Sequence, residues 1–367
     1  MTRPARVVID LDALRHNLSR TRVLAPAARI MAIVKTDAYG HGIGRAARAL
    51  DAADAFGVAC LEEAQQLRDA GVRKPVVLLE GPYSAAELPL ISGLGLDVVV
   101  HHAFQLDLLE SAHLSQPLHA WLKMDSGMHR LGFEPAATAG AWQRLHDCPA
   151  ITAPVRLMTH LALANQPGHP MTGEQLRLFA DTCQSLPGER SIANSAGVLA
   201  WPDSHADWVR PGLMLYGVSP FDSGTGSDHG LHPAMALRSE IISLRRLRRG
   251  DPVGYGASWH CPEDMEVGVV AAGYGDGFPR HARSGTPVLV RGRRSCTIGF
   301  ASMDMLAVDL RAVPDARVGD PVELWGDALP IEDIARSAGT VPYEILCGVH
   351  KRLRFIEHGS AEDPVPM

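Results

Sequence analysis

The first 220 residues of the chain alternate between short apolar runs and longer segments with helical periodicity. The apolar runs place Val, Ile and Leu at consecutive positions, as expected of strands that are buried on both faces of a parallel sheet. We predict strands at residues 29–35, 55–60, 75–81, 97–102, 119–125, 155–161, 191–195 and 208–216. Helical segments lie between them, among them 61–71, 103–113, 134–146 and 172–186. Eight strands that alternate with helices predict an α/β fold, namely a (β/α)8 barrel.

A doubly wound open sheet is the alternative fold that the same alternation allows. No GxGxxG sequence follows an early strand, which argues against a dinucleotide-binding version of that fold. A further short strand, 7–9, precedes a helix that begins at Asp10 or Asp12 and runs to about Leu24. This strand is additional to the eight of the barrel, so it could join a different sheet.

After about residue 233 the helical segments almost disappear, and only 331–338 has helical character. Turns that contain Gly, Pro and Asp separate the apolar runs of this part, which indicates consecutive strands. The predicted strands are 235–244, 266–273, 287–290, 305–309 and 321–325. We therefore predict two domains, an N-terminal (β/α)8 barrel over residues 1–232 and a mainly β domain over 233–367, with an irregular tail from 359 onward.

Composition and the termini exclude several classes of protein. The chain is 46% hydrophobic and 21% charged, which is typical of soluble globular proteins, and its net charge of −6 argues against nucleic acid as a partner. The six cysteines are scattered without a CxxC pair, which suits neither a disulfide framework nor a zinc site. The N-terminus lacks an apolar signal core, and no run of about 18 apolar residues could span a membrane. We expect a cytoplasmic protein with reduced thiols that binds no membrane.

The segment 32–42, AIVKTDAYGHG, is the first candidate for chemistry. Lys35 ends an apolar strand, where the side chains of a barrel leave the core and face a site. An apolar pocket disfavours the ammonium ion, so the neutral amine becomes available as a nucleophile. Such an amine can form a Schiff base with a carbonyl or with pyridoxal phosphate. Taken alone, Lys35 could simply be a lysine whose stem packs at a strand end.

Polar residues also end several other predicted strands. In a barrel all of these strand ends share one face, and that face carries the active site. The residues concerned are Lys35, Lys123, Asp125, His160, Asn194, Ser195 and Arg210. Their convergence favours a functional site over a set of unrelated surface side chains.

Ordered motifs along nearly the whole chain resemble the alanine racemase family, which comprises fold-type III pyridoxal-phosphate enzymes. The motifs are AIVKTDAYGHG (32–42), LKMDSGMHRLGF (122–133), THLALA (159–164), NSAG (194–197), RPGLMLYG (210–217), VGYGASW (253–259), GYGDGFPR (273–280), SMDM (302–305) and VPYEIL (341–346). Any one motif is weak, but the ordered set is specific. The resemblance implies a homodimer with shared active sites that racemises L-alanine and D-alanine with pyridoxal 5′-phosphate, either to supply D-alanine for peptidoglycan or to degrade it.

The resemblance implies two catalytic residues, since racemisation removes a proton on one face of the substrate and delivers one on the other. Lys35 carries the cofactor and serves one face, and Tyr255 is the base on the opposite face. A free tyrosine has a pKa near 10, so Tyr255 needs positive neighbours to act near neutral pH. His160 and Arg210 match the family residues that supply this chain of hydrogen bonds, and Arg210 also faces the pyridine nitrogen.

The remaining site residues are implied in the same way. The NSAG motif reads as the start of a helix, which suits an anion, and Asn194 begins it. The residues implied to contact the phosphate are Tyr39, Ser195, Gly212, Leu213 and Tyr343. Arg130 matches an arginine near the phenolic oxygen of the cofactor and the substrate carboxylate. Lys123 matches a lysine that is carbamylated in many members of the family.

The partner subunit is implied to complete each site. Tyr274, Met303 and Asp304 match family residues that approach the substrate from the other chain, together with Tyr255. Three histidines, His41, His101 and His102, are candidate metal ligands by residue type. No HxxxH helix or matching carboxylate set accompanies them, so we assign no metal.

Two other enzyme or protein classes remain open at this point. An amino-acid decarboxylase on the same architecture would need no second base, so Tyr255 argues for racemisation. A non-catalytic pyridoxal-phosphate carrier is usually a single barrel, which the second domain argues against. Broad-specificity racemases share most motifs, but usually carry an export signal.

Overall fold

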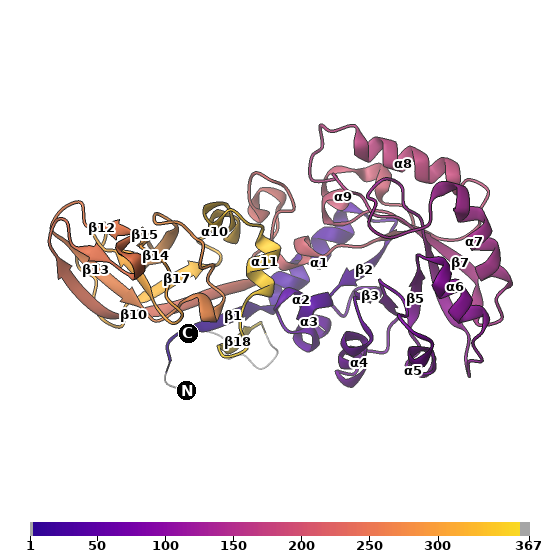
Figure 1. The fold of residues 1–367 in the computed structure, drawn as a ribbon, viewed down its shortest axis with the longest axis horizontal. Coiled ribbons are helices and arrows are strands. Elements are labelled where there is room, and N and C mark those ends of the chain that lie inside the picture. Colours follow the sequence, from indigo (N-terminus) through magenta and orange to yellow (C-terminus); the bar gives the residue numbers. More distant parts are fainter. Residues whose placement is uncertain (1–2, 360–367) are drawn as a thin grey trace.

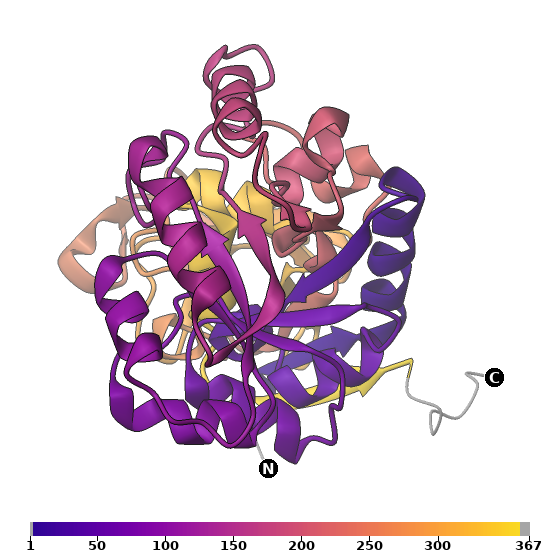
Figure 2. The same cartoon turned by 90° about the vertical axis from the view of Figure 1, so that its right-hand side faces the viewer.

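Eight parallel strands close into a barrel that forms one lobe of the molecule (Figures 1 and 2). This computed structural model describes residues 3–359. The strands are β2 (Arg29–Ile33), β3 (Ala55–Val58), β4 (Val76–Leu78), β5 (Asp97–Val100), β6 (Leu118–Lys123), β7 (Ile151–Met158), β8 (Arg190–Ser191) and β9 (Trp208–Val209). The barrel prediction is confirmed, and the open-sheet alternative is wrong.

Every barrel strand ends earlier than the sequence predicts. The largest difference is in the last strand, which was expected to reach 216 but stops at Val209. Pro211 has no N–H to donate to a sheet, and the apolar residues that follow form a buried 3₁₀ turn, Leu213–Tyr216. Apolar residues that line the end of a barrel therefore look like strand in the sequence although they belong to loops.

Helices surround the barrel strands, as the view along the barrel shows (Figure 2). They are α1 (Leu11–Leu24), α3 (Ile43–Ala49), α4 (Leu61–Asp69), α5 (Leu88–Gly93), α6 (Ala103–Glu110), α7 (Pro135–Asp147), α8 (Met171–Thr182) and α9 (Ser195–Ala200). The Asp10 side chain accepts a hydrogen bond from the Ala13 N–H at 2.9 Å and caps α1, whose Leu11, Leu14 and Leu18 are buried. The four helical segments predicted between the strands are confirmed with small changes at their ends.

The second lobe is built on one eight-stranded sheet. Its strands are β1 (Arg6–Asp10), β10 (Met235–Leu247), β13 (Met265–Val270), β14 (Pro287–Val290), β15 (Arg293–Ile298), β16 (Leu306–Asp309), β17 (Pro321–Trp325) and β18 (Arg354–His358). The order is β13-β16-β15-β14-β17-β10-β1-β18, and the long β10 also pairs with β13. A small hairpin, β11 (Pro252–Val253) and β12 (Trp259–His260), extends from it. Since β1 lies between β10 and β18, the first strand of the chain belongs to this sheet and not to the barrel.

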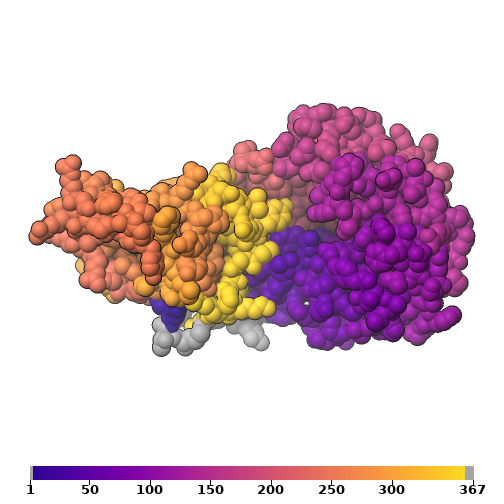
Figure 3. Space-filling view, viewed as in Figure 1, coloured from indigo at the N-terminus to yellow at the C-terminus, as the bar shows by residue number. Residues whose placement is uncertain are grey.

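Two helices of the C-terminal part, α10 (Ile331–Ala338) and α11 (Pro342–Cys347), lie between the lobes (Figure 1). In the space-filling view, these yellow segments lie against the indigo, N-terminal part of the barrel (Figure 3). The contact is close, because a Cβ on Gly40 would lie 2.2 Å from the Leu346 carbonyl oxygen. The barrel segment that follows Lys35 in the chain therefore packs directly against α11.

We propose the domain boundary at residues 232–233, in the irregular segment before β10. Within residues 3–359, no helix combines the length and apolarity that crossing a membrane requires. Apart from Gly359, the predicted irregular tail lies outside the described residues.

Candidate active site

A cavity of ≈ 930 Å³ opens at the C-terminal ends of the barrel strands, under α10 and α11. Its volume lies at the upper end of the range for small-molecule sites. The cavity lining contains eleven of the residues that the sequence predicts for the site. They are Lys35, Tyr39, Lys123, Arg130, His160, Asn194, Ser195, Arg210, Gly212, Leu213 and Tyr343. Asp125 is not in this lining, and its carboxylate instead accepts hydrogen bonds from the Gly127 and His129 N–H groups.

Lys35 begins a left-handed turn, which the sequence did not predict. Strand β2 ends at Ile33, and Thr36, Asp37, Ala38 and Tyr39 all have φ between 52° and 56°. Left-handed backbone costs about 1–2 kcal/mol for each residue other than glycine, so tertiary contacts must hold this turn. The Glu63 carboxylate accepts from the Thr36 N–H at 2.5 Å, and the Asp37 carboxylate accepts from the Ile43 N–H at 2.7 Å. The turn brings both Lys35 and Tyr39 to the cavity.

Positive charge dominates the inner part of the cavity. Burial, together with Arg210, Arg130 and Lys35, lowers the pKa of Lys123 to about 8. Burial likewise lowers the pKa of Arg210, which nevertheless stays protonated at neutral pH. Among the causes of the pKa shift of Lys123, only the Glu80 carboxylate acts in the opposite direction. A site with this excess of cations favours an anionic ligand.

Arg210 and His160 form a buried pair of hydrogen-bonding groups. Arg210 donates to Ser191 Oγ at 2.6 Å, to the Thr159 carbonyl at 2.6 Å and to His160 Nδ1 at 3.3 Å. Burial and Arg210 lower the pKa of His160 well below its usual range, so the imidazole is neutral. Since guanidinium only donates, Nδ1 is the acceptor, and this assigns the ring proton to Nε2.

Hydroxyl and backbone groups gather at another part of the cavity. Ser195 Oγ accepts from the N–H groups of Gly212 and Met214 at 2.9 and 3.3 Å, so its own proton remains free to donate. A Cβ on Gly212 would lie 2.6 Å from Tyr39 Oη, so only glycine lets this hydroxyl approach the backbone. The Tyr39 ring lies 5.9 Å from that of Tyr343, which α11 contributes. The hydroxyls of Ser195, Tyr39 and Tyr343 thus form a cradle of donors that suits a phosphate.

The remaining predicted residues lie on the β lobe, outside the cavity. Tyr255, in the 3₁₀ turn η5 (Tyr255–Ala257), has 70% of its surface exposed. Tyr274 lies in a second such turn, η6 (Tyr274–Asp276), and is 36% exposed, while Met303 is 53% exposed. Asp304 is half exposed and is engaged by arginines. One chain therefore does not bring these four residues to Lys35.

Several residues of the site were not predicted from the sequence. Thr159 and Ser191 hold Arg210, and the Tyr216 hydroxyl donates to the Ile33 carbonyl at 2.8 Å below the Lys35 turn. Thr159 directly follows the observed strand β7 and Ser191 ends β8, but the sequence predicted strands over 155–161 and 191–195, so neither residue was recognised as a strand end. The contacts of α10 with the cavity, through Glu332, Ala335 and Arg336, had no signal in the sequence.

Comparison with known proteins gives one consistent result. Residues 9–220 match the family model of the alanine racemase N-terminal domain, and residues 234–357 match that of the alanine racemase C-terminal domain. The chain is 54% identical to the alanine racemase of Nitrosococcus oceani over 349 residues, which is 95% of this chain and 98% of that protein. It is 49% identical to the biosynthetic alanine racemase of Escherichia coli over 350 residues, again 95% and 98% of the two chains.

Solved structures agree with the relatives in sequence. The biosynthetic alanine racemase from Pseudomonas aeruginosa superposes with a TM-score of 0.95 at 46% identity, covering 97% of this chain and all of that one. The alanine racemase from Acinetobacter baumannii has a TM-score of 0.92 at 37% identity, covering 97% of this chain and all of that one. Both lobes are therefore similar to those of the same set of proteins.

Proposed function

Since this chain belongs to the alanine racemase family and therefore racemises alanine, we propose that it does so with pyridoxal 5′-phosphate held on Lys35. The reaction class is isomerisation of an amino acid at Cα. The observation that carries the proposal is the cavity at the barrel end, which joins Lys35, a neutral His160 on Arg210 and a cradle of hydroxyls.

The residues of the cavity fit the cofactor. Tyr39, Ser195 and Tyr343 would hold the phosphate through their hydroxyls, which are suitable donors, and Gly212 and Leu213 would line the same cradle. Asn194 supports this cradle by capping α9, since its Oδ1 accepts from the Gly197 N–H at 3.0 Å.

The inner part of the cavity would hold the aromatic ring of the cofactor. Arg210 would face the ring nitrogen, and Arg130 would face the phenolic oxygen and the carboxylate of the substrate. When bound, pyridoxal phosphate supplies an electron sink that makes the Cα–H bond of an amino acid acidic.

Two residues of this chain would then move protons. Lys35 has an amine that accepts a proton from, or returns it to, one face of Cα. Tyr255 would serve the opposite face from the partner subunit, and Nε2–H of His160 would donate to the phenolate oxygen and stabilise its charge. Arg210 reinforces this donation because its own proton on Nη2 points at Nδ1.

A homodimer would bring Tyr255 to the cavity. Several large apolar side chains of the β lobe are exposed, among them Tyr255, Phe300, Met303 and Met305, with exposed fractions from 44% to 70%. Such a surface suits a protein partner. We propose a second copy of this chain in head-to-tail contact, so that each site combines one barrel with the Tyr255, Tyr274, Met303 and Asp304 segments of the other chain.

The proposed reaction is tested by following the optical rotation of L-alanine in D2O with the wild-type protein and added pyridoxal phosphate. We expect the rotation to fall to zero and the product to carry deuterium at Cα. Protein stripped of cofactor is the control and should leave the rotation unchanged. Unchanged rotation by protein that holds the cofactor would contradict the proposal, and carbon dioxide released from basic amino acids would indicate the decarboxylase instead.

Lys123 would react with carbon dioxide, because only a neutral amine attacks it and burial favours the neutral form. The amine loses a proton and forms an N-carboxylate, which replaces one positive charge of the cavity by a negative charge beside Arg130. With a lowered pKa of about 8, the neutral fraction rises with pH through that value and shrinks as the pH falls toward 6.

We therefore expect a carbamate signal in the 13C NMR spectrum of protein supplied with 13C-bicarbonate at pH 8, and a weaker signal at pH 6. Lys123→Met should abolish the signal. Lys351→Met is the matched control and should retain it, because Lys351 is 84% exposed. A signal that survives in Lys123→Met would disprove the assignment, and electron density at Lys123 provides an independent check.

The physiological role is also open to a proposal. The relatives from Escherichia coli and Pseudomonas aeruginosa are named biosynthetic, which supports a role in supplying D-alanine rather than degrading it. The six cysteines are free, which supports a location in a reducing compartment such as the cytoplasm.

A further inference from the structure

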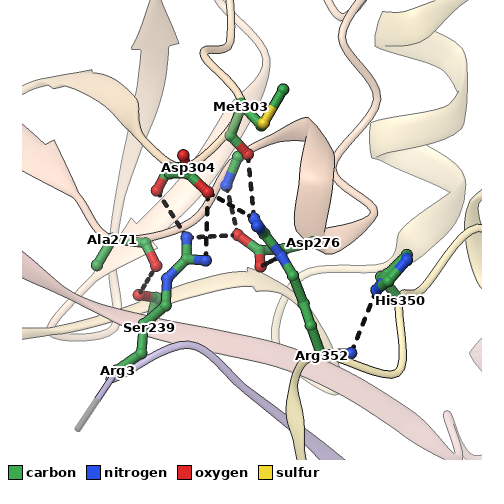
Figure 4. Close-up of polar contacts among 9 residues, drawn as sticks. Arg3, Ser239, Ala271, Asp276, Met303, Asp304, His350 and Arg352 are labelled. Carbon is green, nitrogen blue, oxygen red and sulfur yellow. Dashed lines mark hydrogen bonds and ion pairs between the residues drawn. The ribbon is translucent and has the colours of Figure 1, made fainter.

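Four charged side chains on the β lobe form a compact cluster, made of Arg3, Asp276, Asp304 and Arg352 (Figure 4). The Asp276 side chain is completely buried. Its Oδ2 accepts from Arg3 Nη2 at 2.8 Å and its Oδ1 accepts from Arg352 Nε at 2.8 Å. A buried carboxylate is costly unless it is paired and hydrogen-bonded, and this one is both.

The same two arginines also hold the neighbouring loop 301–305. Arg352 Nη2 lies 2.8 Å from Asp304 Oδ1 and donates to the Met303 carbonyl at 3.3 Å. Arg3 Nη2 donates to the Asp304 carbonyl at 2.8 Å. Two guanidinium groups thus balance two carboxylates, and segments some 270 residues apart in the chain meet at Asp276.

The backbone around the cluster leaves little freedom. Asp276 Oδ2 also accepts from the Gly273 N–H at 2.9 Å, and the N–H groups of Tyr274 and Gly275 donate to the Ser302 and Met303 carbonyls at 3.0 and 2.9 Å. A Cβ on Gly273 would lie 2.2 Å from the Ser302 carbonyl oxygen. Turn η6 and loop 301–305 are therefore fixed to one another, while the side chains of Tyr274 and Met303 remain exposed.

We propose that Asp276, through Arg3 and Arg352, is a positioning residue that holds Tyr274 and Met303 in the arrangement in which they enter the active site of the partner subunit. This inference rests on the proposed shared site. The cluster touches neither the cavity of its own chain nor Lys35, so its effect on catalysis acts on the other chain. A residue that only stabilised the β lobe would act like the Asp309–Arg311 pair of the same lobe and would leave the KM for alanine unchanged.

The first measurement compares Asp276→Asn with Asp309→Asn in dimers whose two chains carry the same substitution. Asp309 is the matched control, because its side chain is 11% exposed and pairs with Arg311 at 2.7 Å in the same lobe, away from the cluster. We expect Asp276→Asn to raise the KM for alanine and to lower kcat/KM by about tenfold, since small misplacements of substrate-contacting groups have effects of this order or larger. Both variants should keep the visible absorbance of bound cofactor, and Asp309→Asn should keep its KM. Equal KM values in the two variants would overturn the proposal.

The second measurement uses dimers of one Lys35→Ala chain and one Tyr255→Phe chain, which have a single intact site. Its barrel comes from the Tyr255→Phe chain and its β lobe from the Lys35→Ala chain. We expect Asp276→Asn to lower kcat/KM when added to the Lys35→Ala chain and to have no effect when added to the Tyr255→Phe chain. An equal effect in both arrangements, or none in either, would overturn the proposal.

This experiment distinguishes failure of the shared-site proposal from failure of the proposal about Asp276. If the mixed dimer is inactive before Asp276 is changed, the shared site is wrong and the inference falls with it. If the mixed dimer is active and the position of Asp276→Asn does not matter, only the inference is wrong. Should Asp276→Asn not fold, Arg3→Ala replaces it, since the Arg3 side chain is one-third exposed and its loss leaves Arg352 on Asp276.

Discussion

Replacing Tyr255 by phenylalanine is expected to lower the rate of racemisation by about 10²–10⁴-fold, the usual range for losing a positioned acid–base group. The change removes one hydroxyl and keeps the ring, and Tyr255 is 70% exposed, so folding should be unaffected. L-alanine and D-alanine have equal free energies, so kcat/KM must fall by the same factor in both directions. Chiral chromatography of reactions started from each enantiomer measures both values.

The two-base mechanism makes a more specific prediction for Tyr255→Phe. In D2O, the enantiomer whose Cα–H faces Lys35 should still exchange its hydrogen for deuterium without inversion, while the other enantiomer should not. Tyr83→Phe is the matched control, because Tyr83 is also exposed, at 56%, and does not line the cavity. Racemisation by Tyr255→Phe at the wild-type rate would exclude Tyr255 as the second base.

Mixing two inactive variants is expected to restore activity. Lys35→Ala removes the amine that holds the cofactor, and Tyr255→Phe removes the opposite base, so each homodimer should be nearly inactive. A purified dimer with one chain of each kind contains one site with both residues intact. We expect about half of the wild-type activity per dimer, since one of two equivalent sites works. Co-expression of differently tagged chains and purification on both tags provides the sample.

The control for the mixed dimer places both substitutions in one chain beside a wild-type chain. In that arrangement each site lacks one of the two residues, so the dimer should be nearly inactive although it holds a complete set of wild-type residues. Activity in this control, or its absence in the complementing pair, would refute a site shared between chains.

The sequence motifs predicted eleven residues that the structure brings together in the cavity. Lys35, Lys123, His160, Ser195 and Arg210 lie at or just beyond strand ends, and in a closed barrel all strand ends meet at one face. Apolar runs and helical periodicity are local properties, so they identified eight strands and the change to a mainly β part without any knowledge of contacts. They did not identify strand ends, because buried apolar residues such as those of Leu213–Tyr216 continue beyond the last residue of a strand.

Features that depend on distant contacts were decided by the tertiary structure alone. The left-handed turn at 36–39 contains no glycine, so no local sequence preference predicts it. It exists because Glu63, Asp37 and α11 hold it. The Asp276 cluster joins residue 3 to residues 276 and 352. Contacts between residues so far apart in the chain cannot be predicted from sequence periodicity.

The sequence by itself therefore determined the two-lobed fold and which residue types gather at the barrel end, because both follow from local patterns and from the residues at strand ends. Tertiary structure decided which predicted residues can act together in one chain. It separates Lys35 from Tyr255, Tyr274 and Met303, since the β lobe carries these three on exposed turns outside the cavity. The physical reason is that the distance between two lobes depends on packing across their interface, which has no counterpart in sequence spacing.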